Sequence, residues 1–125
     1  MIENWEKYPN FSEREFDCSH TGRNEMKPEF MDNIQAMRTE LGRPMIVNSG
    51  YRSPHHPIEA AKEDGPGPHS TGLAADFKVG AGWDVYEFVE LAFKHGFTGI
   101  GVSQREGKPR FVHLDRLNRR AIWSY

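Results

Sequence analysis

The sequence contains a single cysteine, Cys18, and it has neither a long hydrophobic run nor an excess of one charge. One cysteine excludes a disulfide within the chain, which suits a reducing compartment or a domain that needs no cross-link. Sixteen basic and eighteen acidic residues nearly cancel without forming blocks, so the basic patch of a nucleic-acid-binding or membrane-surface protein is missing. No segment approaches the roughly 20 apolar residues of a membrane-spanning helix. We therefore expect no nucleic-acid and no membrane partner.

The first ten residues, MIENWEKYPN, contain no apolar stretch of the kind that a secretory signal peptide requires. This predicts synthesis in the cytoplasm. A length of 125 residues is typical of one domain, so we expect a single domain over residues 1–125 and a monomer. Only 37% of the residues are hydrophobic, but eight Phe, four Tyr and three Trp supply large side chains for a small core. Trp5, Trp83 and Trp123 are expected in that core or in the wall of a cleft.

Capping signals and apolar repeats predict three helices. Ser12 followed by Glu15 is a capping-box pattern and predicts a short helix over 13–17. An apolar repeat of helical period between a proline and a glycine predicts a second helix over 28–41. A third repeat predicts a helix over 83–95. We expect this last helix to bury Val85, Phe88, Val89, Ala92 and Phe93.

Short apolar segments bounded by turn residues predict four strands, over 45–47, 73–79, 99–103 and 110–115. The first of these is expected to be buried, and the last two are expected to be joined by a hairpin turn. Helices and mainly antiparallel strands in this arrangement are typical of an α+β domain, in which helices pack on a small, mainly antiparallel sheet.

A long connection over 54–72, rich in proline and glycine, contains the first candidate for chemistry, because ordered loops of this length are usually functional. His69 lies near its end, Asp76 lies in the strand that follows, and His113 lies in the last predicted strand. Two imidazoles and a carboxylate, with one position left open for water, are the ligand set of a catalytic zinc site. Spacing alone leaves open whether each histidine binds a metal or makes a hydrogen bond in a loop or core.

A second turn-rich loop contains Arg52. A guanidinium near a metal suits a hydrolase, because it binds a developing oxyanion or a substrate carboxylate. A surface salt bridge is the alternative. His55 and His56 follow in the same loop, where we expect solvent-exposed side chains, with His56 as a candidate substrate contact. Cys18 is expected to be a small buried thiol.

Four segments carry motifs in a specific order: Ser49–Pro54 (SGYRSP), His69–Asp76 (HSTGLAAD), Gly99–Gly101 (GIG) and Phe111–Asp115 (FVHLD). Together they resemble the zinc D-alanyl-D-alanine peptidases of peptidoglycan, and the resemblance covers nearly the whole chain. That family includes carboxypeptidases and phage or bacterial murein endopeptidases, and it shares its fold with the amino-terminal domain of Hedgehog proteins. The resemblance therefore implies a Hedgehog/DD-peptidase-like fold and a zinc metallopeptidase.

The resemblance implies one zinc ion per chain, held by His69, Asp76 and His113, with Arg52 facing the substrate. Zinc would polarise the scissile carbonyl and lower the pKa of its bound water, and Arg52 would stabilise the oxyanion. The expected substrates are peptidoglycan stem peptides or cross-links, which contain D-amino acids. Without a signal peptide, the expected setting is a phage endolysin released at lysis or a virion component, and a truncated exported protein is the alternative.

One position departs from the family pattern. Better-known members place a Glu or Asp three residues before the last histidine ligand as the general base, and this sequence has Arg110 there. Asp115 follows His113 by two residues, so both side chains point to the same face of a strand. We therefore predict that Asp115 is either the catalytic base or the group that orients His113.

Two other functions remain open from the sequence. The missing carboxylate at position 110 is compatible with a non-catalytic zinc-containing binding domain or virion structural domain of the same fold. A serine hydrolase that uses Ser49 or Ser70 is a third possibility, but no Gly-x-Ser-x-Gly motif supports it.

Overall fold

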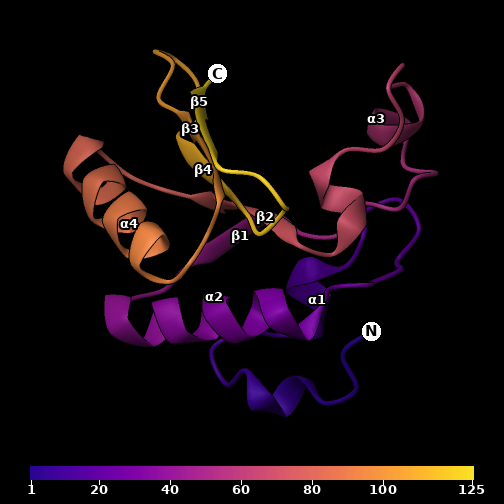
Figure 1. The fold of residues 1–125 in the computed structure, drawn as a ribbon, viewed down its shortest axis with the longest axis horizontal. Coiled ribbons are helices and arrows are strands. Elements are labelled where there is room, and N and C mark those ends of the chain that lie inside the picture. The colour runs from indigo at the N-terminus through magenta and orange to yellow at the C-terminus, as the bar shows by residue number, and fades with distance from the viewer.

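The computed structural model describes residues 1–125, except for the side chain of Trp83. In chain order its elements are α1 (Glu13–Phe16), α2 (Pro28–Leu41), β1 (Ile46–Ser49), α3 (Pro57–Ala60), β2 (Ala74–Lys78), α4 (Gly82–Lys94), β3 (Gly99–Ser103), β4 (Phe111–Asp115) and β5 (Ala121–Ser124), with one-turn 3₁₀ helices at Trp5–Lys7 and Pro68–Thr71. Figure 1 shows α4 on one side of the strands, the loop that carries α3 on the other, and α2 running across the base. The predicted α+β class is confirmed.

The three helices that the sequence predicts, α1, α2 and α4, begin and end within one residue of their expected bounds. Their terminal residues determine where they start and stop. The Ser12 amide donates to Glu15 Oε1 over 2.8 Å, which completes the capping box of α1. Pro28 opens α2, where a missing N–H costs nothing. Gly42 ends α2 with φ of 73°, a backbone conformation that glycine adopts without strain.

The five strands form one sheet in the order β1-β2-β4-β3-β5. Neighbouring strands are antiparallel, except that β3 and β5 run parallel. Side chains alternate between the two faces of a strand, so Phe77, Val112 and Leu114 lie buried on one face while Asp76 and His113 stand on the other. The sheet therefore separates an apolar face from a polar one.

The core lies against the apolar face of the sheet. Phe77 of β2 packs on Phe88 of α4 with ring centroids 5.8 Å apart. Phe30 of α2 meets Phe97, which follows α4, edge to face at 5.6 Å. These contacts hold both long helices on one side, which leaves the polar face free to form a site.

Three details differ from the predictions. The first strand lies at an edge of the sheet, so Ile46 is 52% exposed where burial was expected. In α4 the core-facing stripe includes Leu91, and Phe93 points outward with 60% of its surface exposed. No strand is predicted at β5, whose parallel pairing with β3 depends on a partner that is distant in the sequence.

Other expectations concern single side chains and membrane spans. Cys18 is a buried thiol, as predicted. Trp5 packs against the core, and Trp123 lies beside His113 with ring centroids 5.2 Å apart. The prediction for Trp83 concerns a side chain outside the described part of the structure. Within that described part, none of the helices has the length and apolar character that a bilayer crossing requires.

Candidate metal centre

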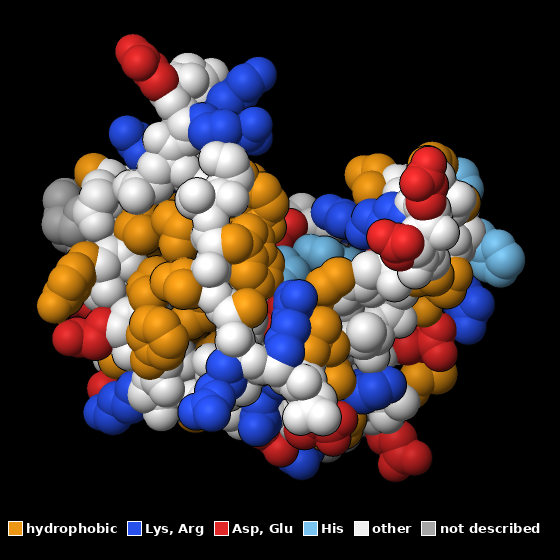
Figure 2. Space-filling model, turned by 45° about the horizontal axis from the view of Figure 1, so that its top comes forward, with side chains coloured by type: hydrophobic (Ala, Val, Ile, Leu, Met, Phe, Trp, Pro, Cys, Tyr) orange, Lys and Arg blue, Asp and Glu red, His pale blue; other side chains and the backbone are white. Residues whose placement is uncertain are grey.

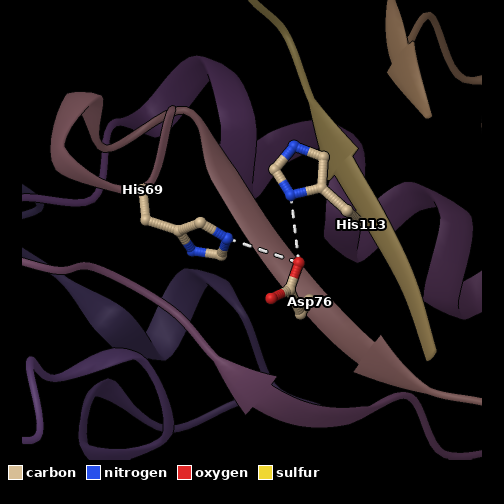
Figure 3. A group of neighbouring side chains, drawn as sticks. All are labelled: His69, Asp76 and His113. Atoms are coloured by element: carbon tan, nitrogen blue, oxygen red, sulfur yellow. Dashed lines mark hydrogen bonds and ion pairs between the residues drawn. The ribbon is translucent and has the colours of Figure 1, made fainter. Parts of the chain in front are cut away.

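The three predicted metal ligands come together on the polar face of the sheet. Asp76 of β2 and His113 of β4 are direct cross-strand partners, so their side chains stand next to each other. His69, on the one-turn helix that precedes β2, reaches the same point. One donor atom from each residue lies within 4.8 Å of the others, and Figure 3 shows both imidazoles pointing at the carboxylate.

Hydrogen bonds bind together the two loops that the sequence singled out. The Arg52 amide donates to the His69 carbonyl over 3.0 Å, and Ser70 Oγ donates to the Arg52 carbonyl over 2.7 Å. Gly72 follows with φ of 78° against the backbone of Glu25, where no side chain would fit. His69 is therefore held on a rigid segment, although it precedes the sheet.

The ring nitrogens of both histidines are fixed by acceptors on their far sides. His69 Nδ1 lies 2.9 Å from the Gly50 carbonyl oxygen, and His113 Nε2 lies 2.8 Å from Asp115 Oδ2. Because a carbonyl or carboxylate oxygen only accepts, each imidazole donates there. Its other nitrogen then faces Asp76 Oδ1, at 3.3 Å from His69 and 3.0 Å from His113. Three electron-pair donors converge, which is the arrangement that a divalent cation stabilises.

Burial and charge tune this cluster. Burial opposes ionisation of Asp76, but its interactions with the His113 and His69 rings outweigh it and hold the pKa of this carboxyl far below its ordinary value. Burial also opposes a charge on His113, but hydrogen bonds to Asp115 and Asp76 raise its pKa above the ordinary value. The site thus favours an ionised carboxylate facing positive charge, and a zinc ion fits the same three atoms.

Asp115 lies on the same face as His113, as predicted, but behind it. Its side chain is fully buried, and Oδ2 accepts from His113 Nε2 and from Arg119 Nη2, the latter over 2.7 Å. The Leu117 amide donates to the other oxygen over 3.3 Å. Gly99, its cross-strand neighbour, has no Cβ, and a Cβ there would collide with this carboxylate. The carboxylate of Asp115 is therefore committed to the far nitrogen of the imidazole.

Trp123 of β5 covers the other side of His113. Trp123 is the cross-strand partner of Gly101 in β3, and Gly101 is also the partner of His113 in β4. A Cβ on Gly101 would lie 2.5 Å from Trp123 Nε1, so a glycine is required to leave room for the indole. The Arg119 guanidinium sits over the indole, 5.0 Å from its centre. The last strand, absent from the sequence prediction, thus supplies a wall of the site.

Arg52 stands beside the cluster. Its Nη2 lies 3.9 Å from Asp76 Oδ2, and its Nη1 lies 3.3 Å from Glu59 Oε2. Figure 2 shows histidine side chains at the bottom of a hollow, between an apolar surface and a raised part that carries basic and acidic side chains. A guanidinium next to the ligand set in such a hollow has the chemistry to bind an anionic group of a ligand.

His56 has a local structural role. It is the N-cap of α3, where its Nδ1 accepts from the Ile58 amide over 3.1 Å. Its Nε2 lies 3.2 Å from Ser19 Oγ. Both ring nitrogens therefore have partners within the protein, and the substrate contact of His56 stays a prediction. His55, as expected, is exposed.

Two charged residues of the site have no signal in the sequence. Glu59 lies in the one-turn helix α3 and Arg119 lies in the turn between β4 and β5, where a solvated side chain is the ordinary expectation. Glu59 is instead only 1% exposed, and Arg119 reaches back to the buried Asp115. Only the path of the chain around the site brings them there.

The donor set, two histidines and an aspartate on a sheet with an arginine beside them, is typical of metal-dependent hydrolases. The family model of Peptidase M15 matches residues 9–115. The chain therefore belongs to the M15 peptidase family, the zinc D-alanyl-D-alanine carboxypeptidase-like peptidases, and the family assigns it metallopeptidase chemistry. Among curated proteins, no sequence matches the chain significantly.

Removal of zinc should destabilise the fold, because an ion held by His69, Asp76 and His113 would tie the His69 segment to β2 and β4. A ligand that binds only the native state stabilises it by RT ln(1 + [L]/Kd), which corresponds to at least about 10 °C in Tm at a thousandfold excess over Kd. Thermal unfolding with and without a chelator measures this shift. His69→Ala is the control, since chelator should leave its Tm unchanged. An equal shift in wild type and control would disprove the link between this cluster and stability.

Proposed function

We propose that the protein is a zinc-dependent peptidase that hydrolyses peptidoglycan peptide bonds involving D-amino acids. The observation that carries this proposal is the convergence of His69 Nε2, Asp76 Oδ1 and His113 Nδ1 beside the Arg52 guanidinium. Membership of the M15 family supports the substrate class, because such peptidases act on cell-wall peptides. Stem peptides and cross-links are the proposed targets.

In this proposal His69, Asp76 and His113 hold one zinc ion, which supplies Lewis acidity and an acidic bound water. Arg52 binds the oxyanion that develops on the scissile carbonyl, or the carboxylate of the substrate, through guanidinium donors that are not used by Glu59. Asp115 keeps the His113 ring in the orientation that directs Nδ1 into the site. Trp123 prevents that ring from turning away.

The position that carries a catalytic carboxylate in better-known members is occupied here by the exposed Arg110. This observation favours a second candidate function, a zinc-containing binding or virion structural domain that retains the fold without hydrolysis. Both candidates place the protein at the cell wall, and we propose that it arrives there by phage lysis or as part of a virion.

Digestion of purified peptidoglycan tests the proposal. The zinc-loaded protein should release new amino groups at defined peptide bonds, and mass spectrometry of the fragments should identify the bond. Chelator should prevent the cleavage, and added zinc should restore it. Intact fragments after long incubation, together with zinc-dependent binding to the wall, would reject the peptidase in favour of the binding domain.

Arg52→Lys should bind zinc normally but turn over poorly, because one ammonium does not reproduce the two-donor fork of a guanidinium. The loss of one oxyanion donor predicts a fall in kcat of roughly tenfold to thousandfold. Steady-state kinetics and metal content are the measurements. Arg43→Lys, in the surface pair with Glu87, is the matched control. Wild-type turnover in Arg52→Lys would remove Arg52 from the mechanism.

A further inference from the structure

The loop that carries α3 contains a buried carboxylate, Glu59, whose side chain is closed off from solvent. Oε1 accepts from the Gly67 amide over 2.7 Å, and both oxygens lie 3.0 Å from Lys62 Nζ. Oε2 also accepts from Arg52 Nη1 over 3.3 Å. Burial opposes its ionisation, but these hydrogen bonds outweigh it and lower the pKa of Glu59. The loop therefore encloses a charged carboxylate.

The partners of Glu59 divide into two groups. Gly67 and Lys62 belong to the same loop, so their bonds to the carboxylate close the loop on itself. Arg52 lies outside the loop and beside the metal ligands. A buried carboxylate that only closed a loop would contribute little to stability, because the desolvation penalty offsets much of the attraction in a buried ion pair. The bond to Arg52 is the contact that links this charge to the site.

The position of Arg52 also needs an explanation. Its guanidinium lies between two carboxylates, 3.3 Å from Glu59 and 3.9 Å from Asp76. Without Glu59, the nearest anionic partner of Arg52 would be Asp76, an oxygen donor that the metal requires. A long flexible side chain also loses much rotamer entropy when it is fixed in one orientation. Glu59 is therefore placed to order the Arg52 side chain and to compete with Asp76 for its guanidinium.

We propose that Glu59 is a positioning residue, which aims the Arg52 guanidinium over the metal centre so that its remaining N–H donors meet the anionic group of the substrate. This inference rests on the proposed function for its kinetic consequences. Glu59 itself does not touch substrate and acts only through Arg52. Lys62 neutralises the outer side of the same carboxylate and has no part in aiming Arg52.

The order of the Arg52 side chain can be measured by ¹⁵N relaxation of its Nε–H group in the zinc-loaded protein. The Arg52 signal is assigned as the one that disappears in Arg52→Lys. In wild type and in Lys62→Met the signal should be that of an ordered group. In Glu59→Gln it should become that of a mobile side chain. An unchanged Arg52 signal in Glu59→Gln overturns the proposal, whether or not the protein hydrolyses anything.

Kinetics on peptidoglycan fragments provide the second readout. Glu59→Gln keeps the acceptor for the Gly67 amide but removes the charge, and kcat should fall about tenfold or more at saturating zinc. The same change in an Arg52→Lys background should add little, because residues that act as a unit are not additive. Full additivity, or an equal loss of kcat in Lys62→Met, overturns the proposal.

Glu59→Gln takes the buried charged partner from both Lys62 and Arg52, which risks a loss of folding. The double variant Glu59→Gln/Lys62→Met removes both charges of the pair together, which is tolerated better than removing one. The double variant should show the signal of a mobile Arg52 side chain when it is compared with Lys62→Met. An ordered Arg52 signal in the double variant overturns the proposal. Failure of the proposed function would appear separately, as wild-type protein that leaves peptidoglycan intact.

Discussion

Alanine at His69, Asp76 or His113 should abolish stoichiometric zinc binding and lower peptide hydrolysis by roughly a thousandfold or more, because a Lewis-acid metal supplies several kcal/mol of transition-state stabilisation. Each variant removes one of the three donors that converge on this point. Two remaining donors do not hold zinc against exchange with buffer. The measurement is metal content after gel filtration, followed by turnover.

The two histidine variants should differ in stability when a chelator is present. His69→Ala should unfold near the wild-type temperature, because its segment is held by the backbone bond from Arg52 and by Ser70. His113→Ala should be less stable, because it takes a partner from the fully buried Asp115. His55→Ala, at an exposed position of the α3 loop, is the control and should retain one zinc per chain. Full zinc in all three ligand variants would show that the metal binds elsewhere.

The sequence predicted the helices well because their ends depend on neighbouring residues. The capping box of Ser12 and Glu15 and the left-handed Gly42 act within a few residues of themselves. β5 depends on a partner far along the chain, since Ile122 pairs with Ile100 in parallel register and remains exposed. Such a strand has no local alternation that a sequence pattern detects. The exposed Phe93 is a second example, because a helical repeat in the sequence does not show which side of α4 packs against the core.

The convergence of His69, Asp76 and His113 could be predicted because the motifs that contain them also build the sheet. Asp76 and His113 fall on adjacent strands in register, and the turn at Gly72 brings His69 beside them. The carboxylates around the site were less predictable. The burial of Glu59 follows from how the loop closes over Gly67, and no residue near it in sequence reports that path. The proposed role of Glu59 therefore depends on its contacts and not on a sequence motif.

Replacement of Asp115 should also have a large effect. The sequence left open whether Asp115 is the catalytic base or the group that orients His113, and the geometry favours the orienting role. A base must reach a proton on the reacting groups, but Asp115 is 0% exposed and its oxygens are taken by His113, Arg119 and the Leu117 amide. We therefore expect Asp115→Asn to weaken zinc binding by roughly tenfold to a hundredfold, as for other partners that orient a metal-binding histidine.

The asparagine has one oxygen where the aspartate has two, so its amide NH₂ must face a donor in either orientation. It meets the Leu117 amide if the oxygen stays between His113 and Arg119, and it meets those two donors if the side chain is flipped. The imidazole should therefore lose its fixed orientation, while the zinc-saturated variant should recover most of its turnover. Zinc titration, with turnover measured at each concentration, separates the two roles. Asp84→Asn, in the surface pair with Arg43, is the control. If turnover instead stays about a hundredfold low at saturating zinc while zinc affinity is unchanged, Asp115 transfers the proton and the orienting role is wrong.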